Sequence, residues 1–539
     1  MAELPESGAG LYDSDKLRAV LQGAGRAETG RAETGRAETG RAESDRAETE
    51  TSLFDAGLLD PLRQGSRQME LTDDAAWLQA LVDVELALSR ALVDVGLAPE
   101  WMRDVCAQLA DARSLDLQAI AAEGRGGGNP VIPLVKHLSR AADAVRSGAS
   151  DHVHVGATSQ DILDSAAMLV AARVAAELRS QLAALATTLI DLADAHRTTV
   201  MAGRTLGQQA SPTSFGFVVA GWLDAVVTVL VRLDALIPTL PAQLGGAVGN
   251  LAVLTEVAAA RSRDAASAAQ PASPTAIVDA VLERFAAHLG LAVPRLSWHT
   301  NRLPITELGS LLAQVTGVVG NLASNVTVLS RTEIGEVSER LGAGEGGSSA
   351  MPHKRNPVTA VLIVAAARQT PALLATLHAS LLSDDQRPAG AWHAEWQPLR
   401  DLERHALAAV TASVSLVGRL DVDAERMLAN LELTDGLIFS ERVTTILAEA
   451  IGKAPAFTLV EQASRESVST RRPLKVTLSG LLAGAGTDDT LRARVWAACD
   501  VQAGVDHAVD HSPAAIDRVI ARAQAAIQKS PAREGTARP

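Results

Sequence analysis

Three apolar stripes with heptad-like spacing constrain the fold of this chain more than any other feature. Within each stripe, apolar residues recur at intervals of three and four, which is the spacing of one face of an α-helix. Long helices with such faces pack side by side at shallow angles. The pattern predicts an all-α fold with a central bundle of long helices. The stripes are Leu178, Leu182, Leu185, Leu189 and Leu192; Trp222, Val226, Val229, Leu233 and Leu236; and Leu308, Leu312, Val315, Val319, Leu322, Val326 and Leu329.

Prolines and polar segments mark where helices begin and end. Pro238 and Pro241 are expected to end the second long helix, and Pro304 precedes the third. Upstream, the pattern over residues 72–95 predicts an amphipathic helix with Thr72 as its N-cap. We therefore expect three helical domains: an N-terminal domain over 51–155, the central bundle over 156–420, and a C-terminal domain over 421–539.

The beginning of the chain has a different character. Residues 25–50 repeat the sequence GRAET with a period of five, and alanine is the only apolar residue type among them. A period of five matches neither a helix nor a strand, so no apolar face can form. Residues 1–50 are predicted to be a disordered, solvated tail.

Composition excludes several functions. The 539 residues hold 49 Lys and Arg against 63 Asp and Glu, a net charge of −14, which argues against a non-specific binder of nucleic acid or of an anionic membrane. Two cysteines, Cys106 and Cys499, exclude a disulfide framework and a cysteine zinc cluster. The longest apolar run, Phe215 to Val231, contains Asp224, and the N-terminus lacks a signal-peptide pattern. We expect a soluble, cytoplasmic protein without a membrane span.

One segment between helices combines glycines with hydroxyls and cations. Residues 342–357 begin with four glycines in six residues, followed by Ser348, Ser349, Lys354 and Arg355. A flexible loop that carries hydroxyls beside cations suits a lid that closes over a carboxylate-rich substrate. A plain interhelical linker is the alternative interpretation.

Two further polar clusters lie at predicted helix ends. His154, Thr158 and Ser159 come where the first long helix begins, and N-terminal N–H groups with hydroxyls form an anion site. Simple helix capping by Thr158 or Ser159 is the alternative. Arg204 and Gln208 lie between the first two long helices, where a surface turn explains them equally well. His152 and His154 lack a third ligand nearby, so no metal site is expected.

The segment 347–357, with the sequence GSSAMPHKRNP, resembles the signature loop of the fumarase/aspartase superfamily, and the resemblance covers most of residues 55–530. It implies a central helical bundle, a homotetramer whose active sites are shared between subunits, a small polycarboxylate substrate and no cofactor. Within the superfamily the chain is most similar to the bacterial 3-carboxy-cis,cis-muconate cycloisomerases, in the stretches Gly128–Val135, Gly156–Asp161, Leu244–Gly249 and Trp298–Arg302.

The resemblance also implies roles for individual residues. Ser348 would be the acid/base, with Ser349 as the alternative that the sequence does not separate from it. Lys354 and Asn356 would stabilise the carbanionic aci-carboxylate intermediate. The residues expected to contact substrate carboxylates are His154, Thr158, Ser159, Arg204, Gln208 and Arg302, with Asn129 and Ser349 added.

Two departures from the superfamily pattern bear on the reaction. Lyases that expel an amine carry a His and a paired Glu where this chain has Leu206 and Val361. An amine must be protonated as it leaves, whereas a carboxylate leaves as a stable anion and needs no general acid. The departures favour lactonisation of 3-carboxy-cis,cis-muconate to 4-carboxymuconolactone in protocatechuate breakdown. The rivals are an adenylosuccinate lyase-like elimination that releases fumarate, and a catalytically inactive helical scaffold.

Overall fold

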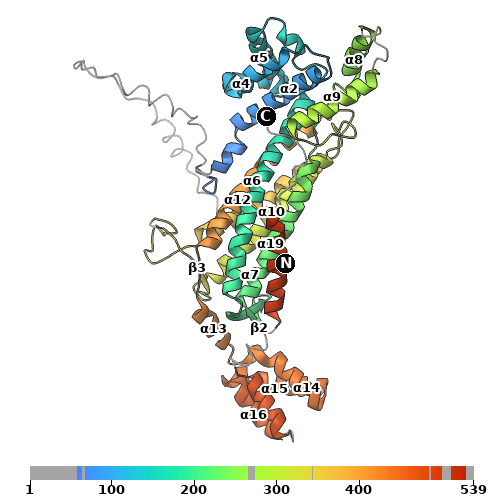
Figure 1. Ribbon diagram of the computed structural model, residues 1–539. Helices are drawn as coiled ribbons and strands as arrows, with labels where there is room; N and C mark the ends of the chain where they lie inside the picture. Colours follow the sequence, from blue (N-terminus) through green and yellow to red (C-terminus); the bar gives the residue numbers. More distant parts are fainter. Residues whose placement is uncertain are drawn as a thin grey trace, which may run out of the picture. The chain divides into compact units, whose positions relative to one another are not determined.

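The computed structural model describes residues 58–63, 67–264, 273–342, 344–484, 487–500 and 511–529. The predicted tail over 1–50 lies outside these residues. Contacts divide the chain into one unit up to Leu58 and a second from Leu59 onward, and the description below concerns the second unit. Its described residues are predominantly helical, with only two short two-stranded sheets, so the predicted all-α class is confirmed (Figure 1).

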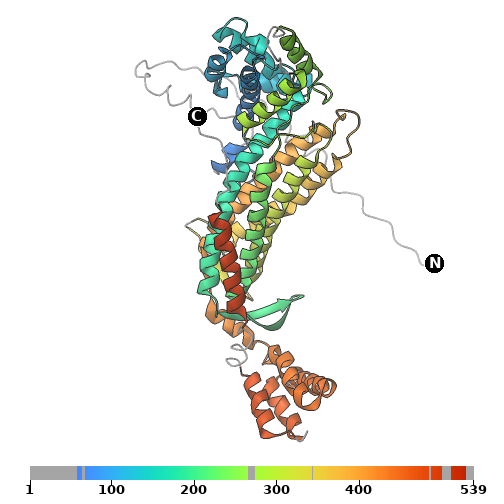
Figure 2. The same cartoon turned by 45° about the vertical axis from the view of Figure 1, so that its right-hand side comes forward.

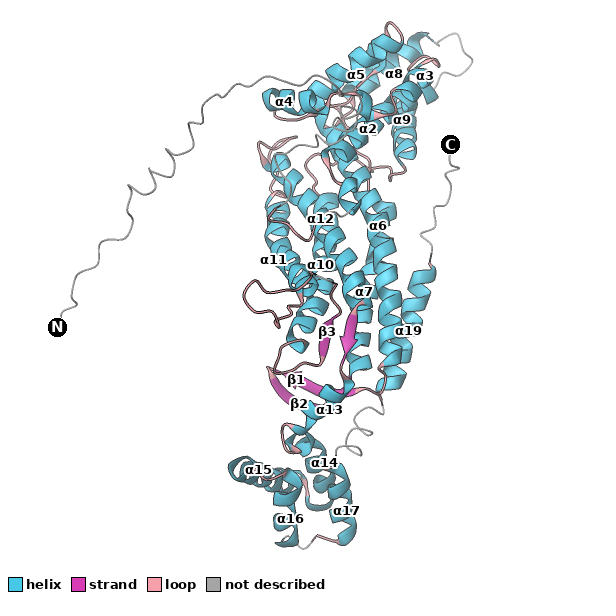
Figure 3. Cartoon of the chain, turned by 90° about the vertical axis from the view of Figure 1, so that its left-hand side faces the viewer, coloured by secondary structure: helices cyan, strands magenta, loops and turns pink. Residues whose placement is uncertain are grey.

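Five long helices form the central bundle, where α10 packs on α11, α11 on α12, and α6 on both α7 and α12 (Figure 3). The three predicted stripes fall on α6, α7 and α10. Their side chains are buried in one continuous core, apart from Leu192 and Leu236 near the helix ends, which are half-buried. The five helices are α6 (Ser159–Ala195), α7 (Phe215–Leu236), α10 (Leu303–Leu329), α11 (Val358–Ala379) and α12 (Ala391–Gly418).

A β-hairpin joins α6 to α7, where the sequence indicated only a polar turn. Strand β1 (Val200–Thr205) pairs antiparallel with β2 (Gln208–Ser214), and Figure 2 shows the hairpin at one end of the bundle. Leu206 and Gly207 form its tip with φ values of +52° and +82°. A tight turn of this handedness matches the twist of the strands that it connects. The second pair, β3 (Val337–Glu339) with β4 (Leu420–Val422), lies where α10 and α12 end.

The N-terminal helices pack against the start of α6, mainly through α2. The helix predicted over 72–95 is α2, but its N-cap is Asp73, whose side chain accepts a hydrogen bond from the backbone N–H of Ala76. Thr72 is instead buried. The elements of this region are η1 (Arg67–Leu71), α2 (Asp74–Asp94), α3 (Met102–Gln108), η2 (Ala112–Ser114), α4 (Leu117–Gly127), α5 (Val131–Val145) and η3 (Ala149–His152). Between α7 and α10 lie η4 (Ile237–Thr239), α8 (Ala252–Asp264) and α9 (Pro274–Leu289).

The described helices after β4, which were predicted to form one C-terminal domain over 421–539, pack in two places. Helices α14 to α17 share a small core of their own, whereas α19 packs against α6 and α7 (Figure 2). The reason is its apolar face, since Ile516, Ala523 and Ala526 are buried in the bundle core. The elements are α13 (Ala424–Glu432), η5 (Leu437–Phe439), α14 (Ser440–Ile451), α15 (Lys453–Thr470), α16 (Leu474–Gly484), α17 (Asp489–Ala498) and α19 (Ser512–Gln528).

Three bundle helices are long and apolar enough to cross a membrane, judged by length and composition alone: 215–239, 303–329 and 358–379. Polar residues interrupt each of these helices, so none of them forms an uninterrupted apolar run in the sequence. About half of the first two windows is buried within the unit, against 22% of the third. Helix α11 therefore presents a largely uncovered apolar surface.

Candidate active site

The polar clusters predicted from the sequence lie at opposite ends of the bundle within one chain (Figure 3). His154, Thr158 and Ser159, here called the α6 cluster, stand where α6 begins, and the hairpin follows where α6 ends. The 37 residues of α6 span roughly 55 Å at ~1.5 Å per residue. The signature loop (347–357) begins near the hairpin end, because Glu336, which precedes β3, is bonded to Arg204 of the hairpin.

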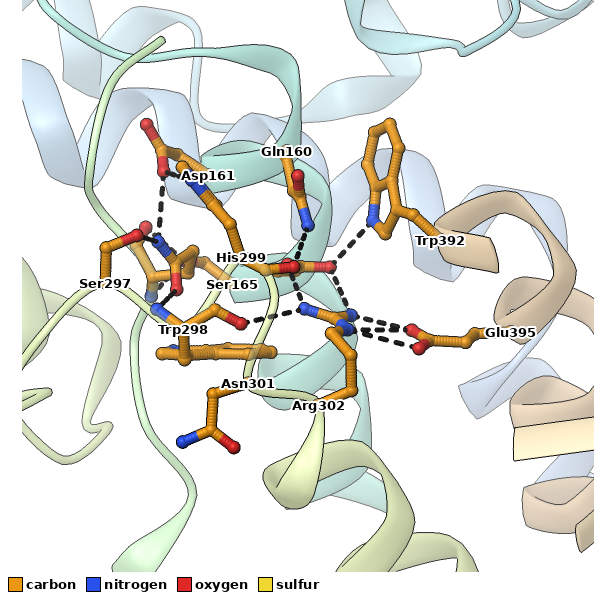
Figure 4. Close-up of polar contacts among 12 residues, drawn as sticks. Gln160, Asp161, Ser165, Ser297, Trp298, His299, Asn301, Arg302, Trp392 and Glu395 are labelled. Atoms are coloured by element: carbon orange, nitrogen blue, oxygen red, sulfur yellow. Dashed lines mark hydrogen bonds and ion pairs between the residues drawn. The ribbon is translucent and has the colours of Figure 1, made fainter. Parts of the chain in front are cut away.

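At the start of α6, Asp161 organises the surrounding backbone (Figure 4). Its carboxylate accepts hydrogen bonds from the backbone N–H groups of Gly245 and Gly246, both at 2.9 Å, and His299 Nε2 lies 2.7 Å from Oδ1. It also accepts from the N–H of Thr158, closing a capping box. Asp161 is fully buried, so it fixes the loop over 244–249 against the start of α6.

Arg302 was predicted to contact a substrate carboxylate, and in the structure it is bonded to two carboxylates of the protein. Its guanidinium lies between the carboxylates of Asp164 and Glu395, each at 2.7 Å, and only 1% of the side chain is exposed (Figure 4). Trp392 Nε1 donates to Asp164 as well, at 3.0 Å. Burial raises the pKa of Glu395, although its bonds to Arg302 oppose that shift. The guanidinium therefore links the start of α10 to Asp164 on α6 and to Glu395 on α12.

Arg204 is also committed to protein partners rather than free for substrate. Its guanidinium donates to both oxygens of the buried Glu336 carboxylate, at 2.5 and 3.0 Å, and Asn430 donates to the same carboxylate at 2.7 Å. These bonds attach the hairpin, two residues before its tip, to α13. Gln208 lies at the exposed end of the hairpin, so of the two predicted contacts only Gln208 is available.

Asn129 and Thr158 have local structural partners too. The side-chain oxygen of Asn129 accepts from the backbone N–H groups of Val131 and Ile132, at 3.1 and 3.3 Å, where α5 begins. The Thr158 hydroxyl accepts a hydrogen bond of 2.9 Å from the guanidinium of Arg387. Arg387 also donates to the side-chain oxygen of Gln160 at 3.0 Å. It was not among the site residues predicted from the sequence. The sequence gives little indication of this role, since Arg387 lies in the loop between α11 and α12, 226 positions beyond Asp161 in the chain.

In the signature loop the predicted catalytic side chains make only local contacts. The Ser348 hydroxyl oxygen accepts from the backbone N–H groups of Ala350 and Met351, at 3.3 and 3.1 Å. Ser349 and Lys354 are exposed. The Asn356 amide donates to the carbonyl of Gly346 at 3.3 Å, which closes the loop on itself. Within the described residues, no group of three or more His, Cys, Asp or Glu side chains could hold a metal ion.

Comparison with known proteins identifies the class to which this fold and site belong. A family model described as lyase matches residues 63–371. The chain is 44% identical over 428 residues to nitrosuccinate lyase of Streptomyces davaonensis, covering 79% of this chain and 88% of that protein. It is 39% identical over 422 residues to 3-carboxy-cis,cis-muconate cycloisomerase of Pseudomonas aeruginosa, covering 78% and 88% respectively.

A solved structure supports the same assignment. The 3-carboxy-cis,cis-muconate lactonizing enzyme from Pseudomonas putida superposes with a TM-score of 0.75 at 32% sequence identity, covering 87% of this chain and 99% of that one. This chain therefore belongs to the lyase family of the fumarase/aspartase superfamily. It is an enzyme of the lyase type, and the family resemblance inferred from the signature loop is confirmed.

Proposed function

We propose that this enzyme catalyses an elimination, or the reverse addition, in which the departing or attacking group is a stable anion. The observation that carries the proposal is the pair Leu206 and Val361, which stand where amine-expelling members have a His and a Glu. Both side chains are exposed and apolar. Neither can protonate a leaving group, which favours a group that departs without a proton.

Ser348 is the proposed acid/base, and its surroundings support that role. Two backbone N–H groups already point at its oxygen, and hydrogen bonds to an oxyanion favour the charged form. The alkoxide that removes a proton α to a carboxylate is thereby stabilised. Lys354 supplies an exposed positive charge that forms no ion pair within the described part of the chain. With Asn356, it is proposed to stabilise the aci-carboxylate intermediate.

The first candidate reaction is lactonisation of 3-carboxy-cis,cis-muconate to 4-carboxymuconolactone, in protocatechuate breakdown, in the cytoplasm and without a cofactor. Here a carboxylate of the substrate attacks its own diene, and Ser348 delivers the proton. Two cycloisomerases support this reading, the relative from Pseudomonas aeruginosa and the solved structure from Pseudomonas putida.

The second candidate is loss of nitrite from nitrosuccinate, favoured by the 44% identity to a nitrosuccinate lyase. Nitrite is also a stable anion, so the same absence of a general acid is tolerated. Removal of the proton α to a carboxylate by Ser348 and departure of nitrite would leave fumarate. An adenylosuccinate lyase-like reaction fits less well, since its leaving group is an amine.

The proposed assembly is a homotetramer in which each site draws on more than one subunit. Two features support it: the α6 cluster and the signature loop are a helix length apart within one chain, and α11 leaves most of its apolar window uncovered. Two hollows between α7 and α10, which share Arg232 and Gln314 in their lining, add a further concave surface. A second copy that covers these faces explains them without a membrane. No nucleic acid or membrane partner is proposed.

The deciding experiment is an ultraviolet assay without added metal or nucleotide. Purified enzyme is mixed separately with 3-carboxy-cis,cis-muconate, nitrosuccinate and adenylosuccinate, following loss of diene absorbance or formation of fumarate. Turnover of either of the first two, with none of adenylosuccinate, supports the proposal and selects the candidate. Release of fumarate from adenylosuccinate would contradict it, and inactivity on all three would favour another substrate or an inactive scaffold.

A further inference from the structure

A buried carboxylate lies beneath the histidine of the α6 cluster. Glu85, on α2, accepts a 2.7 Å hydrogen bond on Oε1 from Nδ1 of His154. The Glu85 side chain is completely buried, whereas the imidazole keeps 21% of its surface exposed. The second carboxylate oxygen, Oε2, has no hydrogen-bond partner among the described residues. A buried carboxylate with one partner depends on that partner for its compensation.

The backbone that carries His154 is held in an unusual conformation. His154 has a φ of +60°, a region that costs free energy for a side chain of this kind and persists only where the surroundings enforce it. Ser89, one turn after Glu85 on α2, donates to the carbonyl of His152 at 3.0 Å. Two side chains on one face of α2 thus hold the segment that leads into α6.

The charges around His154 favour its protonated form. Burial alone lowers the pKa of His154, but the nearby Glu85 carboxylate and, to a smaller extent, Asp161 outweigh it, so the pKa lies above its ordinary value. Glu85 comes from α2 and Asp161 from α6, the two helices that flank the histidine. The ring nitrogen that does not face Glu85 is then an N–H donor, on a residue of the segment that leads into α6.

We propose that Glu85 is a positioning residue that keeps His154 charged and oriented, so that its free N–H binds a substrate carboxylate beside the first turn of α6. This inference rests on the proposed function, because it assumes a polycarboxylate substrate. It gives the enzyme a His–Glu pair other than the one lost at positions 206 and 361. Its task is to bind an anion, and it does not protonate a leaving group.

The test is the pH dependence of binding of tricarballylate, a tricarboxylate probe, measured by calorimetry on the full-length wild-type enzyme and its variants. In the wild type, affinity falls as pH rises through the pKa of His154. Glu85→Gln keeps the size and a hydrogen-bonding group but removes the charge, and should move that fall to lower pH by about one unit or more. Ser89→Ala, which removes the neighbouring anchor without changing charge, should leave its midpoint in place.

A second variant keeps the test decisive if Glu85→Gln does not fold. His154→Gln should abolish the fall in affinity, and a fall that persists in this variant would overturn the proposal. Equal midpoints in wild type and Glu85→Gln would also overturn it, as would a wild type that does not bind tricarballylate. Intact pH-dependent binding without turnover of any of the three substrates would contradict the proposed function and leave the role of Glu85 standing.

Discussion

At the end of the bundle where α6 begins, charged side chains are buried and paired, whereas the cations of the signature loop are exposed. Arg302 has two carboxylate partners and almost no exposed surface, while Lys354 lies in solvent. Burying charge is costly unless every group finds a partner, so the first arrangement holds helices in place. An exposed charge keeps its capacity to bind a substrate. Buried, paired charges thus hold the helices around the site, and exposed charges are the ones proposed to perform its chemistry.

The largest expected effect is on catalysis at the exposed end. Ser348→Ala should lower kcat by about 10²–10⁴-fold, the usual contribution of a positioned acid/base. The melting temperature should not change, because the hydroxyl contacts only the neighbouring backbone. Steady-state kinetics and thermal denaturation measure the two effects. Ser349→Ala is the matched control, and a larger loss in that variant would transfer the role to Ser349.

The next effect is on stability at the buried end. Arg302→Met should destabilise the protein by about 3–5 kcal/mol, because it leaves Asp164 and Glu395 buried without their counter-charge. Lys354→Met should change stability by less than about 0.5 kcal/mol while it lowers activity. Thermal denaturation of both variants gives the comparison. An unchanged melting temperature with a raised KM in Arg302→Met would return Arg302 to the substrate site.

A buried group on α12 predicts a pH-dependent effect. Glu403 is completely buried, neither carboxylate oxygen has a hydrogen-bond partner among the described residues, and burial raises its pKa to about 8. Between its unfolded value near 4.5 and about 8, the folded protein holds a proton that the unfolded chain has released. Stability therefore falls as pH rises through that window, by at most about 1.4 kcal/mol per pH unit.

Glu403→Leu removes this proton linkage. At pH 8 the variant should have a higher melting temperature than the wild type, and this difference should become smaller toward pH 5. Thermal denaturation over that range measures it, with Glu425→Leu at an exposed position of α13 as the control. A gain that does not depend on pH would show that packing, and not the proton, sets the cost of Glu403.

The smallest expected effect is at the hairpin tip. Leu206 is fully exposed at a positive φ, so Leu206→His should alter stability by less than about 0.5 kcal/mol. It should not raise kcat on the preferred substrate, because an anionic leaving group has no use for the added acid. Acquired activity on adenylosuccinate would show instead that only this residue separates the enzyme from amine lyases.

The sequence predicted the bundle because a helix repeats its environment every 3.6 residues, so that Leu178 and its partners on α6 could be recognised without any distant contact. It did not predict the hairpin, since the residues from Gln208 to Ser214 are mostly polar and lack strand alternation. It did not predict the partners of Arg302 for a related reason. The stretch Trp298–Arg302 could be recognised in the sequence. Its partners Asp164 and Glu395, however, are 138 and 93 residues away, and only the folded chain brings them together.

Because the two clusters are separated within one chain, we propose that the α6 cluster of one chain works with the signature loop of another. Subunit complementation tests it most directly. Ser348→Ala and His154→Gln, each of low activity alone, are co-expressed with different affinity tags, and the mixed oligomers are isolated and assayed. If the two clusters come from different chains, random mixing restores about one site in four. If one chain supplied both clusters, every site would carry one lesion, and mixed oligomers no more active than their parents would contradict the claim.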